Sequence, residues 1–490
     1  MVELGILIVV ILVTGAGLIA GYKVRDNADF LTGGGKSSTL LATGAVVGTL
    51  IGSQSTLGTA QLAFNFGISA CWFTVGTALG CLAIALLYCD KLRYSGCTTQ
   101  FQIISREYGK LTEKAGAILC TTGTFISILA QVTACIGFMM TLYPSLNLFQ
   151  ASCVSSLLIC LYIIFGGTWG LGFGGLIKVA LIYITCAACF VIALMNAGGV
   201  TGIFTGAEKF LLDSNIGRVH KIFNHSDFAA NYLNLTARGF HKDLGSCVSL
   251  ILGLLSTQTY MQFILSARDS RSAKYSFLWG LALVPPVGVA GIFIGLYMRA
   301  NYITLDELKT LVSMGLQIPD VPVLVSTIQV FPAFIVRHIS PFFGGLMVGT
   351  LLVTVIGGSS GLLLGISAIL VEDVLTAFKF VKSHKLFFSR AIIIFTLIIA
   401  AFIANNFTAS AINDLGFLSM TLRASVVFMP LTCALWLKKR ISRRFILASI
   451  ILSPLIAIMG ALFNFPLEPL YIGMSVSVLC CVIGFYSQRT

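Results

Sequence analysis

The sequence predicts an all-α integral membrane protein with about 13 transmembrane helices. Of its 490 residues, 57% are hydrophobic and 10% are charged, whereas soluble domains carry about 25% charged residues. Residues 37–89 and residues 115–177 contain no Asp, Glu, Lys or Arg. One bilayer crossing takes roughly 20 apolar residues, so each of these stretches must hold two crossings. A soluble fold is therefore excluded.

Hydropathy along the chain defines the predicted spans. They are residues 3–22, 38–65, 68–89, 114–142, 148–165, 173–197, 245–265, 276–298, 340–371, 389–406, 410–437, 445–463 and 469–487. No basic residue precedes the first span, so we expect a retained helix and not a cleaved signal. Cys186 and Cys189 fall inside a span, where a thiol behaves as a small apolar side chain.

Basic residues mark one side of the predicted bundle. Of the 31 Lys and Arg residues, 22 lie on one side of the predicted bundle. They are in loops 23–36, 91–114, 268–274, 379–390 and 438–444, and they include Lys178 and Arg489. Because cytoplasmic loops are rich in Lys and Arg, we expect a plasma-membrane protein with its N-terminus outside and its C-terminus in the cytoplasm. The net charge of +13 then reflects topology and does not indicate a nucleic-acid partner.

Two long loops, 198–244 and 299–339, are predicted on the outside. Both have helical patterns, and Thr304-x-x-Glu307 has the spacing of a capping box.

An enzyme would need a nucleophile with a base, a carboxylate pair or a metal cluster. All five histidines fall in loops or at helix ends. His220, His225 and Asp227 contain metal-ligating groups, but their spacing matches no standard site, and a solvated loop is the simpler interpretation. We therefore expect no enzymatic activity.

The second span is predicted to break in its middle. Residues 48–58 read Gly-Thr-Leu-Ile-Gly-Ser-Gln-Ser-Thr-Leu-Gly. Glycine costs a helix about 1 kcal/mol relative to alanine, and interrupted backbone at membrane depth is tolerated only where it lines protein or water. The seventh span carries a similar run, residues 253–260, and enters the membrane from the opposite side.

Interrupted spans at matching positions of two halves indicate a substrate site near the bilayer midplane. The alternative is close helix packing through small residues. Gln54, Gln131 and Gln258 favour the site, because buried amides without partners are costly. The predicted solute-binding residues are Ser53, Gln54, Ser55, Gln131, Thr257, Gln258, Tyr260 and Arg423.

Several short motifs follow one another along the chain. They are Ile51-Gly52-x-x-Ser55-x-x-Gly58, Gly67-x-Ser69-x-x-Trp72, Tyr94-Ser95-Gly96-x-Thr98, Arg106-x-Tyr108-Gly109, Gly166-Gly167-x-x-Gly170, and Leu255-Ser256-Thr257-Gln258 with Gln262 and Ser266-Ala267-Arg268. With these motifs in this order, the chain resembles the sodium:solute symporter family from about residue 20 to 440. The resemblance implies a LeuT-type five-plus-five inverted repeat with rocking-type alternating access. Its halves would be 38–197 and 245–437, with 1–22 and 445–487 as peripheral helices.

The resemblance also implies a sodium site, formed by carbonyls at the first break and hydroxyls on the ninth span. The corresponding positions are Gly48, Ile51, Thr354, Gly357, Gly358 and Ser359. Counted back from Asp373, the expected hydroxyl pair falls on Gly357 and Gly358, which leaves Thr354, or Ser359 and Ser360 after a slip of one turn. The acid expected early in the sixth span falls on Gly175. The site therefore offers fewer oxygens than a sodium ion prefers.

Two further charges lie inside spans and have two interpretations each. Lys178 either snorkels to the cytoplasm or points inward, takes the place of the ion and exchanges a proton during the cycle. Arg423 either binds an anionic solute such as a carboxylate or caps carbonyls of a neighbouring helix. Asp414 lies about 13 Å from Arg423 along the helix axis and does not pair with it.

The sequence thus predicts a secondary active transporter of a small organic solute, working as a monomeric unit with no cofactor other than a coupling ion. Sodium symport follows from the resemblance, and a sodium-independent or proton-coupled cycle through Lys178 is the alternative. A membrane sensor is a third interpretation, but the predicted spans leave no room for an output domain.

Overall fold

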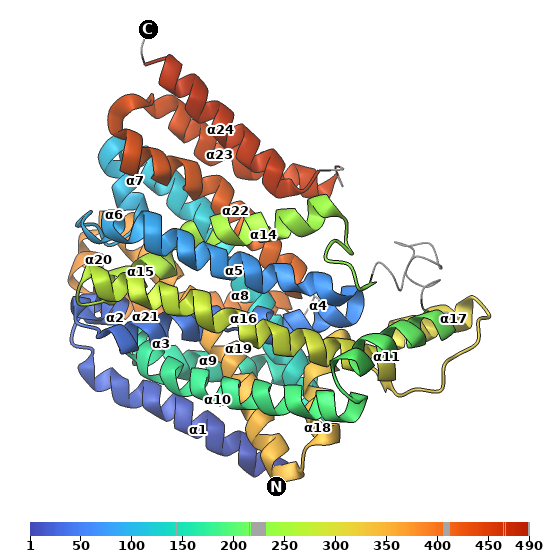
Figure 1. Ribbon diagram of the computed structural model, residues 1–490. Coiled ribbons are helices and arrows are strands. Elements are labelled where there is room, and N and C mark those ends of the chain that lie inside the picture. Colours follow the sequence, from blue (N-terminus) through green and yellow to red (C-terminus); the bar gives the residue numbers. More distant parts are fainter. Residues whose placement is uncertain are drawn as a thin grey trace.

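The computed structural model describes residues 1–143, 145–214, 216, 232–404, 412–463, 465 and 467–488. Most of these residues belong to helices that form one bundle (Figure 1). In the described part of the chain, the strands are β1 (Ile303–Thr304) and β2 (Val323–Leu324), which pair in parallel. The predicted all-α class is confirmed.

The apolar helices of the bundle follow the predicted spans. They are α1 (Val2–Ala20), α3 (Thr39–Leu50), α4 (Thr59–Phe66), α5 (Cys71–Ala83), α8 (Lys110–Leu142), α9 (Leu148–Ile163), α10 (Gly167–Ala197), α14 (Phe240–Leu255), α15 (Gln258–Ser266), α16 (Ser270–Asn301), α19 (Pro341–Ile369), α21 (Lys385–Ala404), α22 (Ile412–Thr432), α23 (Arg443–Leu462) and α24 (Pro469–Tyr486). In Figure 1, α1 lies at one edge of the bundle and α23 and α24 lie at the opposite edge.

The other α-helices lie in the connections. They are α2 (Asn27–Thr32), α6 (Cys89–Arg93), α7 (Gln100–Tyr108), α11 (Val200–Asp213), α17 (Leu305–Ser313), α18 (Val330–His338) and α20 (Lys379–Ser383).

The predicted count of thirteen spans is not confirmed. By length and composition, ten helices of the described chain can cross a membrane, or eleven if α14 and α15 form one bent span. The predicted span 148–165 corresponds to α9, whose 16 residues are fewer than the roughly 20 of a full crossing. The predicted span 38–65 is divided between α3, with 12 residues, and a helical segment from Gln54 that continues through α5 and counts with it as one span. The chain is nevertheless a multi-pass membrane protein.

Both predicted helix breaks are present. After α3, Ile51 leaves the helical region with φ −81° and ψ 81°. Helical backbone resumes in the π-helical turn η3 (Gln54–Gly58), which leads into α4. Ser256 and Thr257 separate α14 from α15, and the two helices are bent by 49°.

Glycines allow the backbones of α3 and α10 to touch. A Cβ on Gly175 would lie 2.1 Å from the carbonyl oxygen of Gly44, and a Cβ on Gly48 would lie 2.7 Å from the Cα of Gly175. No side chain fits at these positions. Gly175, where the resemblance implied an acid, is therefore a packing residue.

The two broken helices are joined at the end of the bundle that carries loops 23–36, 91–114 and 268–274, called here the basic end. Ser37, before α3, forms a β-bridge with Ala267, after α15. The amide of Ser37 donates to the Ser266 carbonyl at 2.8 Å, and the amide of Arg268 donates to the Ser37 carbonyl at 2.9 Å.

At the opposite end, the capping box predicted at Thr304 is present. Its hydroxyl accepts from the Glu307 amide at 3.2 Å, and the Glu307 carboxylate accepts from the Thr304 amide at 2.8 Å. Glu307 also pairs with Arg299 at 2.9 Å, which ties α17 to α16. The three residues considered as metal ligands, His220, His225 and Asp227, lie outside the described residues.

Candidate solute-binding site

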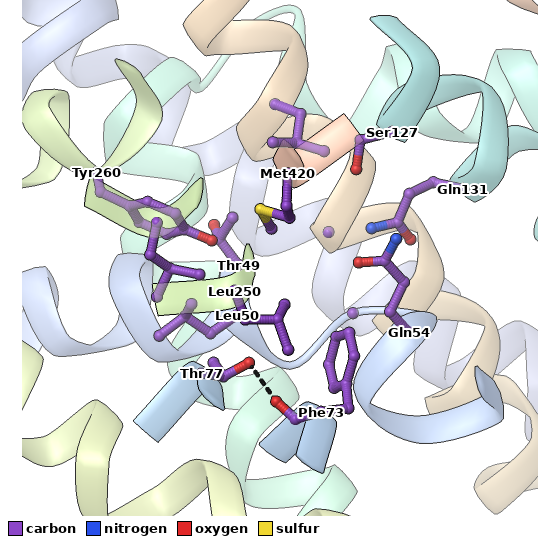
Figure 2. Close-up of a pocket in the computed structure, with 14 residues that line it drawn as sticks. Thr49, Leu50, Gln54, Phe73, Thr77, Ser127, Gln131, Leu250, Tyr260 and Met420 are labelled. Atoms are coloured by element: carbon purple, nitrogen blue, oxygen red, sulfur yellow. Dashed lines mark hydrogen bonds between the residues drawn. The ribbon is translucent and has the colours of Figure 1, made fainter. Parts of the chain in front are cut away.

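A small cavity lies beside the first helix break (Figure 2). It leaves about 30 Å³ for the centres of water-sized molecules, which is room for very few waters. Its lining comes from both broken helices and from α5, α8, α19 and α22. The lining residues are Thr49, Leu50, Gly52, Gln54, Phe73, Thr77, Ser127, Gln131, Leu250, Leu254, Tyr260, Gly358, Leu362 and Met420.

Polar groups gather on the side of the cavity formed by the break. The hydroxyl of Ser53 donates to Oε1 of Gln131 at 2.5 Å, and the Ser53 amide donates to the same oxygen at 3.3 Å. Nε2 of Gln54 and the hydroxyl of Thr49 are buried and have no hydrogen-bond partner among the residues that the structure describes. Leaving such a group unpaired costs about 1–3 kcal/mol. A solute that bonds to these two groups would recover that cost.

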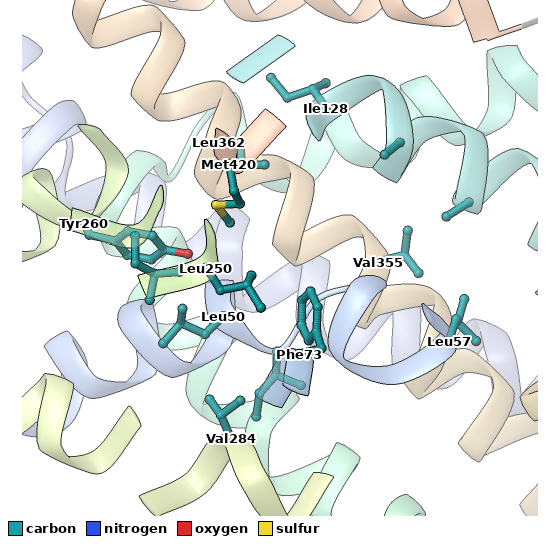
Figure 3. Packing of buried hydrophobic residues seen from close by; sticks show 14 of the residues in the cluster. Leu50, Leu57, Phe73, Ile128, Leu250, Tyr260, Val284, Val355, Leu362 and Met420 are labelled. Carbon is teal, nitrogen blue, oxygen red and sulfur yellow. The ribbon is translucent and has the colours of Figure 1, made fainter. Parts of the chain in front are cut away.

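The opposite walls are apolar. Leu50, Phe73, Leu250 and Met420 pack around the cavity (Figure 3). Tyr260 points its hydroxyl between them (Figure 2). The lining contains no charged side chain. Apolar walls with a few convergent polar groups are the usual composition of a site for a small organic molecule.

Gln258 does not line the cavity, contrary to the prediction. Its Oε1 accepts from the Gln100 amide at 3.0 Å, and its Nε2 donates to the Thr98 carbonyl at 3.0 Å. Gln100 in turn donates from Nε2 to the Ser256 carbonyl at 3.1 Å. The second break is thus closed by residues 98–100, and its amide is already satisfied.

Two other predicted solute ligands also bond to backbone outside the lining. The hydroxyl of Ser55 lies 3.2 Å from the Leu50 carbonyl and 3.1 Å from the Gly52 carbonyl, and it stabilises the first break. The hydroxyl of Thr257 donates to the Gly253 carbonyl at 2.6 Å.

Lys178 points inward and does not snorkel. Its side chain is 1% exposed. Its Nζ donates to the Ile51 carbonyl at 2.9 Å and to the Thr354 carbonyl at 3.3 Å. A Cβ on Gly357 would lie 2.6 Å from the same nitrogen, so the glycine leaves the space that the ammonium uses. The interpretation of Lys178 as a snorkelling residue is therefore wrong.

The other predicted ion-coupling residues do not form an oxygen cage for sodium. The hydroxyl of Thr354 donates to the Thr350 carbonyl at 2.7 Å, and that of Ser359 donates to the Ile356 carbonyl at 2.9 Å, both within α19. The Cα of Gly358 faces the amide of Gln131, and Gly48 packs on Gly175. Since the carbonyls of Ile51 and Thr354 bind an ammonium, the residues present do not fit a sodium ion at this position.

Arg423 is fully buried behind the cavity wall, beside the second break. Its Nη1 donates to the Thr257 hydroxyl at 2.7 Å, and its Nε donates to the Ser419 carbonyl at 3.2 Å. Its Nη2 contacts the Ser419 hydroxyl and the sulfur of Met420, both at 3.1 Å. Asp414 is exposed and forms no ion pair with Arg423, as predicted.

Sequence reasoning missed most of the cavity lining. Ser127 precedes Gln131 by one helical turn on α8, so helical spacing around the buried amide was a usable signal for it. Phe73, Leu250 and Met420 carry no such signal, because they resemble every other apolar residue of the spans.

The fold is that of a membrane transporter. The structure of a Na+-coupled sialic acid symporter, in a substrate-bound outward-open state, is similar with a TM-score of 0.78 at 15% sequence identity, covering 100% of this chain and 97% of that chain. High-affinity choline transporter 1 of Caenorhabditis elegans is 21% identical over 312 residues, which are 59% of this chain. The match covers 50% of that relative, so the chain spans about half its length.

The family is defined by a match that covers most of the sequence. Residues 30–451 match the sodium:solute symporter family. The chain belongs to this family.

Proposed function

We propose that this protein is a secondary active symporter that moves a small organic solute by alternating access, with the solute bound at the first helix break. The observation that carries this proposal is the cavity in which Gln54 and Thr49 present unpaired polar groups between apolar walls. The joined ends at Ser37 and Ala267, together with the ion pair of Lys274 and Asp90 at 2.5 Å, keep the basic end closed. In this conformation the solute would reach the cavity from the opposite end.

The second part of the proposal is that Lys178 takes the place of the coupling ion. Its ammonium joins α10 to the first break and to α19 through the carbonyls of Ile51 and Thr354. A desolvated lysine can release and rebind a proton. Loss of the proton removes the charge that these carbonyls bind, and this would free α10 to move relative to α3. The cycle would then be independent of sodium and linked to protons, whereas family membership alone favours sodium.

We also propose that the protein acts in the cell membrane as a monomeric unit, without an enzymatic step, a cofactor or a nucleic-acid partner. The basic end would face the cytoplasm, with the N-terminus outside and the C-terminus inside. The distribution of Lys and Arg supports this orientation.

The solutes named for the two similar proteins do not settle the cargo. Choline is a cation and sialic acid is an acid, so the two names point to opposite charges. The cargo must therefore be inferred from the site itself.

Uptake into proteoliposomes tests the coupling proposal. The solute would be one that raises the melting temperature of the purified protein in a screen of small acids, amines and sugars. Uptake is then measured in sodium buffer and in potassium buffer, with and without an inward proton gradient. Uptake by the wild type is expected to be the same in both buffers and to rise with the inward proton gradient. Uptake by Lys178→Gln is expected to lose its dependence on the proton gradient.

The matched control is Lys114→Gln, which removes an exposed lysine near the basic end and should behave as the wild type. Wild-type uptake that disappears without sodium would show that Lys178 does not replace the ion.

A further inference from the structure

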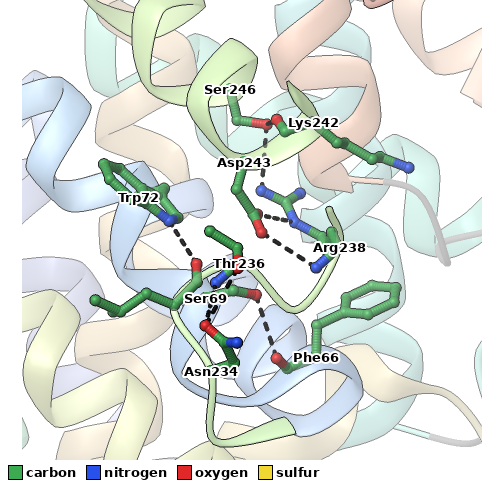
Figure 4. A network of polar contacts seen from close by, with 10 residues as sticks. Phe66, Ser69, Trp72, Asn234, Thr236, Arg238, Lys242, Asp243 and Ser246 are labelled. Carbon is green, nitrogen blue, oxygen red and sulfur yellow. Dashed lines mark hydrogen bonds and ion pairs between the residues drawn. The ribbon is translucent and has the colours of Figure 1, made fainter. Parts of the chain in front are cut away.

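The buried arginines of the protein differ in their partners. Arg299 pairs with Glu307 at 2.9 Å. Arg238, whose side chain is 3% exposed, pairs with Asp243 at 2.7 Å (Figure 4). Arg423 is more deeply buried than either, and no carboxylate pairs with it among the described residues. Its charge is therefore not compensated by a carboxylate within the described part of the chain.

The contacts of Arg423 are all neutral. A guanidinium has five N–H groups, and those of Arg423 contact two hydroxyls, one carbonyl and one thioether sulfur. The titratable groups that face it are Cys120 and Tyr260. Keeping an ion in a low-dielectric interior is expensive unless an opposite charge is nearby. A buried arginine whose contacts are all neutral is suited to bind an anion.

Arg423 lies directly behind the wall of the cavity. Met420, whose sulfur contacts Nη2 of Arg423 at 3.1 Å, lines the cavity, and so does Tyr260. Figure 2 shows the Met420 side chain reaching into the space opposite Gln54. A methionine side chain is flexible, and its sulfur is a weak acceptor. Rotation of Met420 would expose the guanidinium to a solute in the cavity.

Lys178 places a second positive charge on the other side of the cavity. It lies on α10 and donates to the Ile51 carbonyl at the first break, whereas Arg423 lies on α22 and donates to the Thr257 hydroxyl at the second break. These helices are the fifth of each predicted half. Each cation therefore sits beside the break in its own half. Neither has a carboxylate partner among the described residues, and the cavity lining has no acid to offset them. The local field favours an anion and disfavours a cation.

We propose that the transported solute carries a carboxylate, and that Arg423 binds this group in place of the Met420 sulfur. The proposal rests on the proposed function, since it assigns the charge of the solute in the same cavity. A carboxylate can accept two parallel N–H bonds from a guanidinium. The amide of Gln54 and the hydroxyl of Thr49 would then bind polar groups at the other end of the solute.

Matched acid and amide pairs test this proposal by thermal stabilisation of the purified full-length protein. The probes are propionate and propionamide, benzoate and benzamide, and nicotinate and nicotinamide, with choline as the cationic probe. We expect an acid to stabilise the wild type while its amide and choline do not. Arg423→Gln should weaken binding of that acid by about 10- to 100-fold, and Arg423→Lys should weaken it less.

The melting temperature without any probe supplies a second measurement, with Arg299→Gln as the control. Arg423→Gln should melt at or above the wild-type temperature, because it removes an uncompensated charge. Arg299→Gln should melt lower, because it leaves Glu307 buried without its cation, but it should bind the acid as the wild type does. A fall in melting temperature for Arg423→Gln like that of Arg299→Gln would identify Arg423 as a structural cap and overturn the proposal.

Stabilisation by choline, or by an acid and its amide equally, would also overturn it. All titrations are run in sodium buffer and in potassium buffer. Acid binding that requires sodium would contradict the role proposed for Lys178 while leaving the carboxylate assignment intact, so the two failures are distinguishable.

Discussion

The two helix breaks of this protein have the same kind of sequence but differ in the hydrogen-bond partners of their polar groups. At the first break, the Ile51 carbonyl accepts from Lys178, and Nε2 of Gln54 has no hydrogen-bond partner within the described chain. At the second break, Gln258 and Ser256 are bonded to residues 98–100. The first break is therefore available to a solute, whereas the second is tied to the segment that leads into α7.

This difference indicates that the first break serves solute binding and that the second break serves the movement of the helices. Groups that are unpaired in the protein are available to a ligand, and groups that are paired across elements transmit a change of position. The second break contributes Tyr260 and residues of α14 to the cavity wall. The amide of Gln258 at this break is bonded to Thr98 and Gln100 at the basic end. Substitutions at the first break should therefore change solute affinity, whereas substitutions at the second break should change the melting temperature.

The largest expected effect concerns the packing that places Lys178 at the first break. Gly175→Ala puts a methyl group 2.1 Å from the Gly44 carbonyl oxygen, and a backbone atom cannot yield to it. We expect the free energy of unfolding to fall by about 3 kcal/mol, measured by thermal or denaturant unfolding. Gly15→Ala on α1, where nothing lies within 4 Å, is the control. An unchanged stability of Gly175→Ala would contradict the contact between α10 and α3.

The next effect separates the two glutamines. Gln54→Ala should weaken solute binding by about 10- to 100-fold and leave the melting temperature unchanged, because its Nε2 has no hydrogen-bond partner among the described residues. Gln258→Ala should lower the melting temperature and leave the solute affinity unchanged, because its bonds are to Thr98 and Gln100. If both variants lose affinity alike, the two breaks bind the solute together and the comparison fails.

A smaller effect concerns the space used by the ammonium. Gly357→Ala places a methyl group 2.6 Å from Nζ of Lys178, and this flexible end can move away. We expect a folded protein whose uptake rate falls by about tenfold, which corresponds to about 1.4 kcal/mol. Gly344→Ala, on the same helix with no neighbour closer than 3.6 Å, should transport normally. Normal uptake by Gly357→Ala would show that the position of the ammonium is unimportant.

The smallest expected effect is at Thr49. Thr49→Val removes a hydroxyl with no protein partner, so stability should not fall, and solute affinity should drop only a few-fold. Thr354→Val, by contrast, loses a bond of 2.7 Å to the Thr350 carbonyl and should cost stability of about 1 kcal/mol. Equal losses of stability in the two variants would mean that Thr49 is paired within the protein.

The sequence predicted the breaks because glycine, hydroxyl and amide residues stand together in otherwise apolar spans. It could not predict which glutamine is free, because that depends on whether residues 98–100 fold back onto α15. Lys178 presented the same difficulty. Its distance from the helix end allows both snorkelling and burial, and the contact of α10 with the first break decides between them.

We propose that the ammonium of Lys178 takes the position of a coupling sodium ion. Equilibrium binding of radioactive sodium to the purified protein tests it most directly, with and without a stabilising solute. We expect no saturable sodium binding by the wild type across the millimolar range. Saturable binding of one or more sodium ions per chain by the wild type would contradict it.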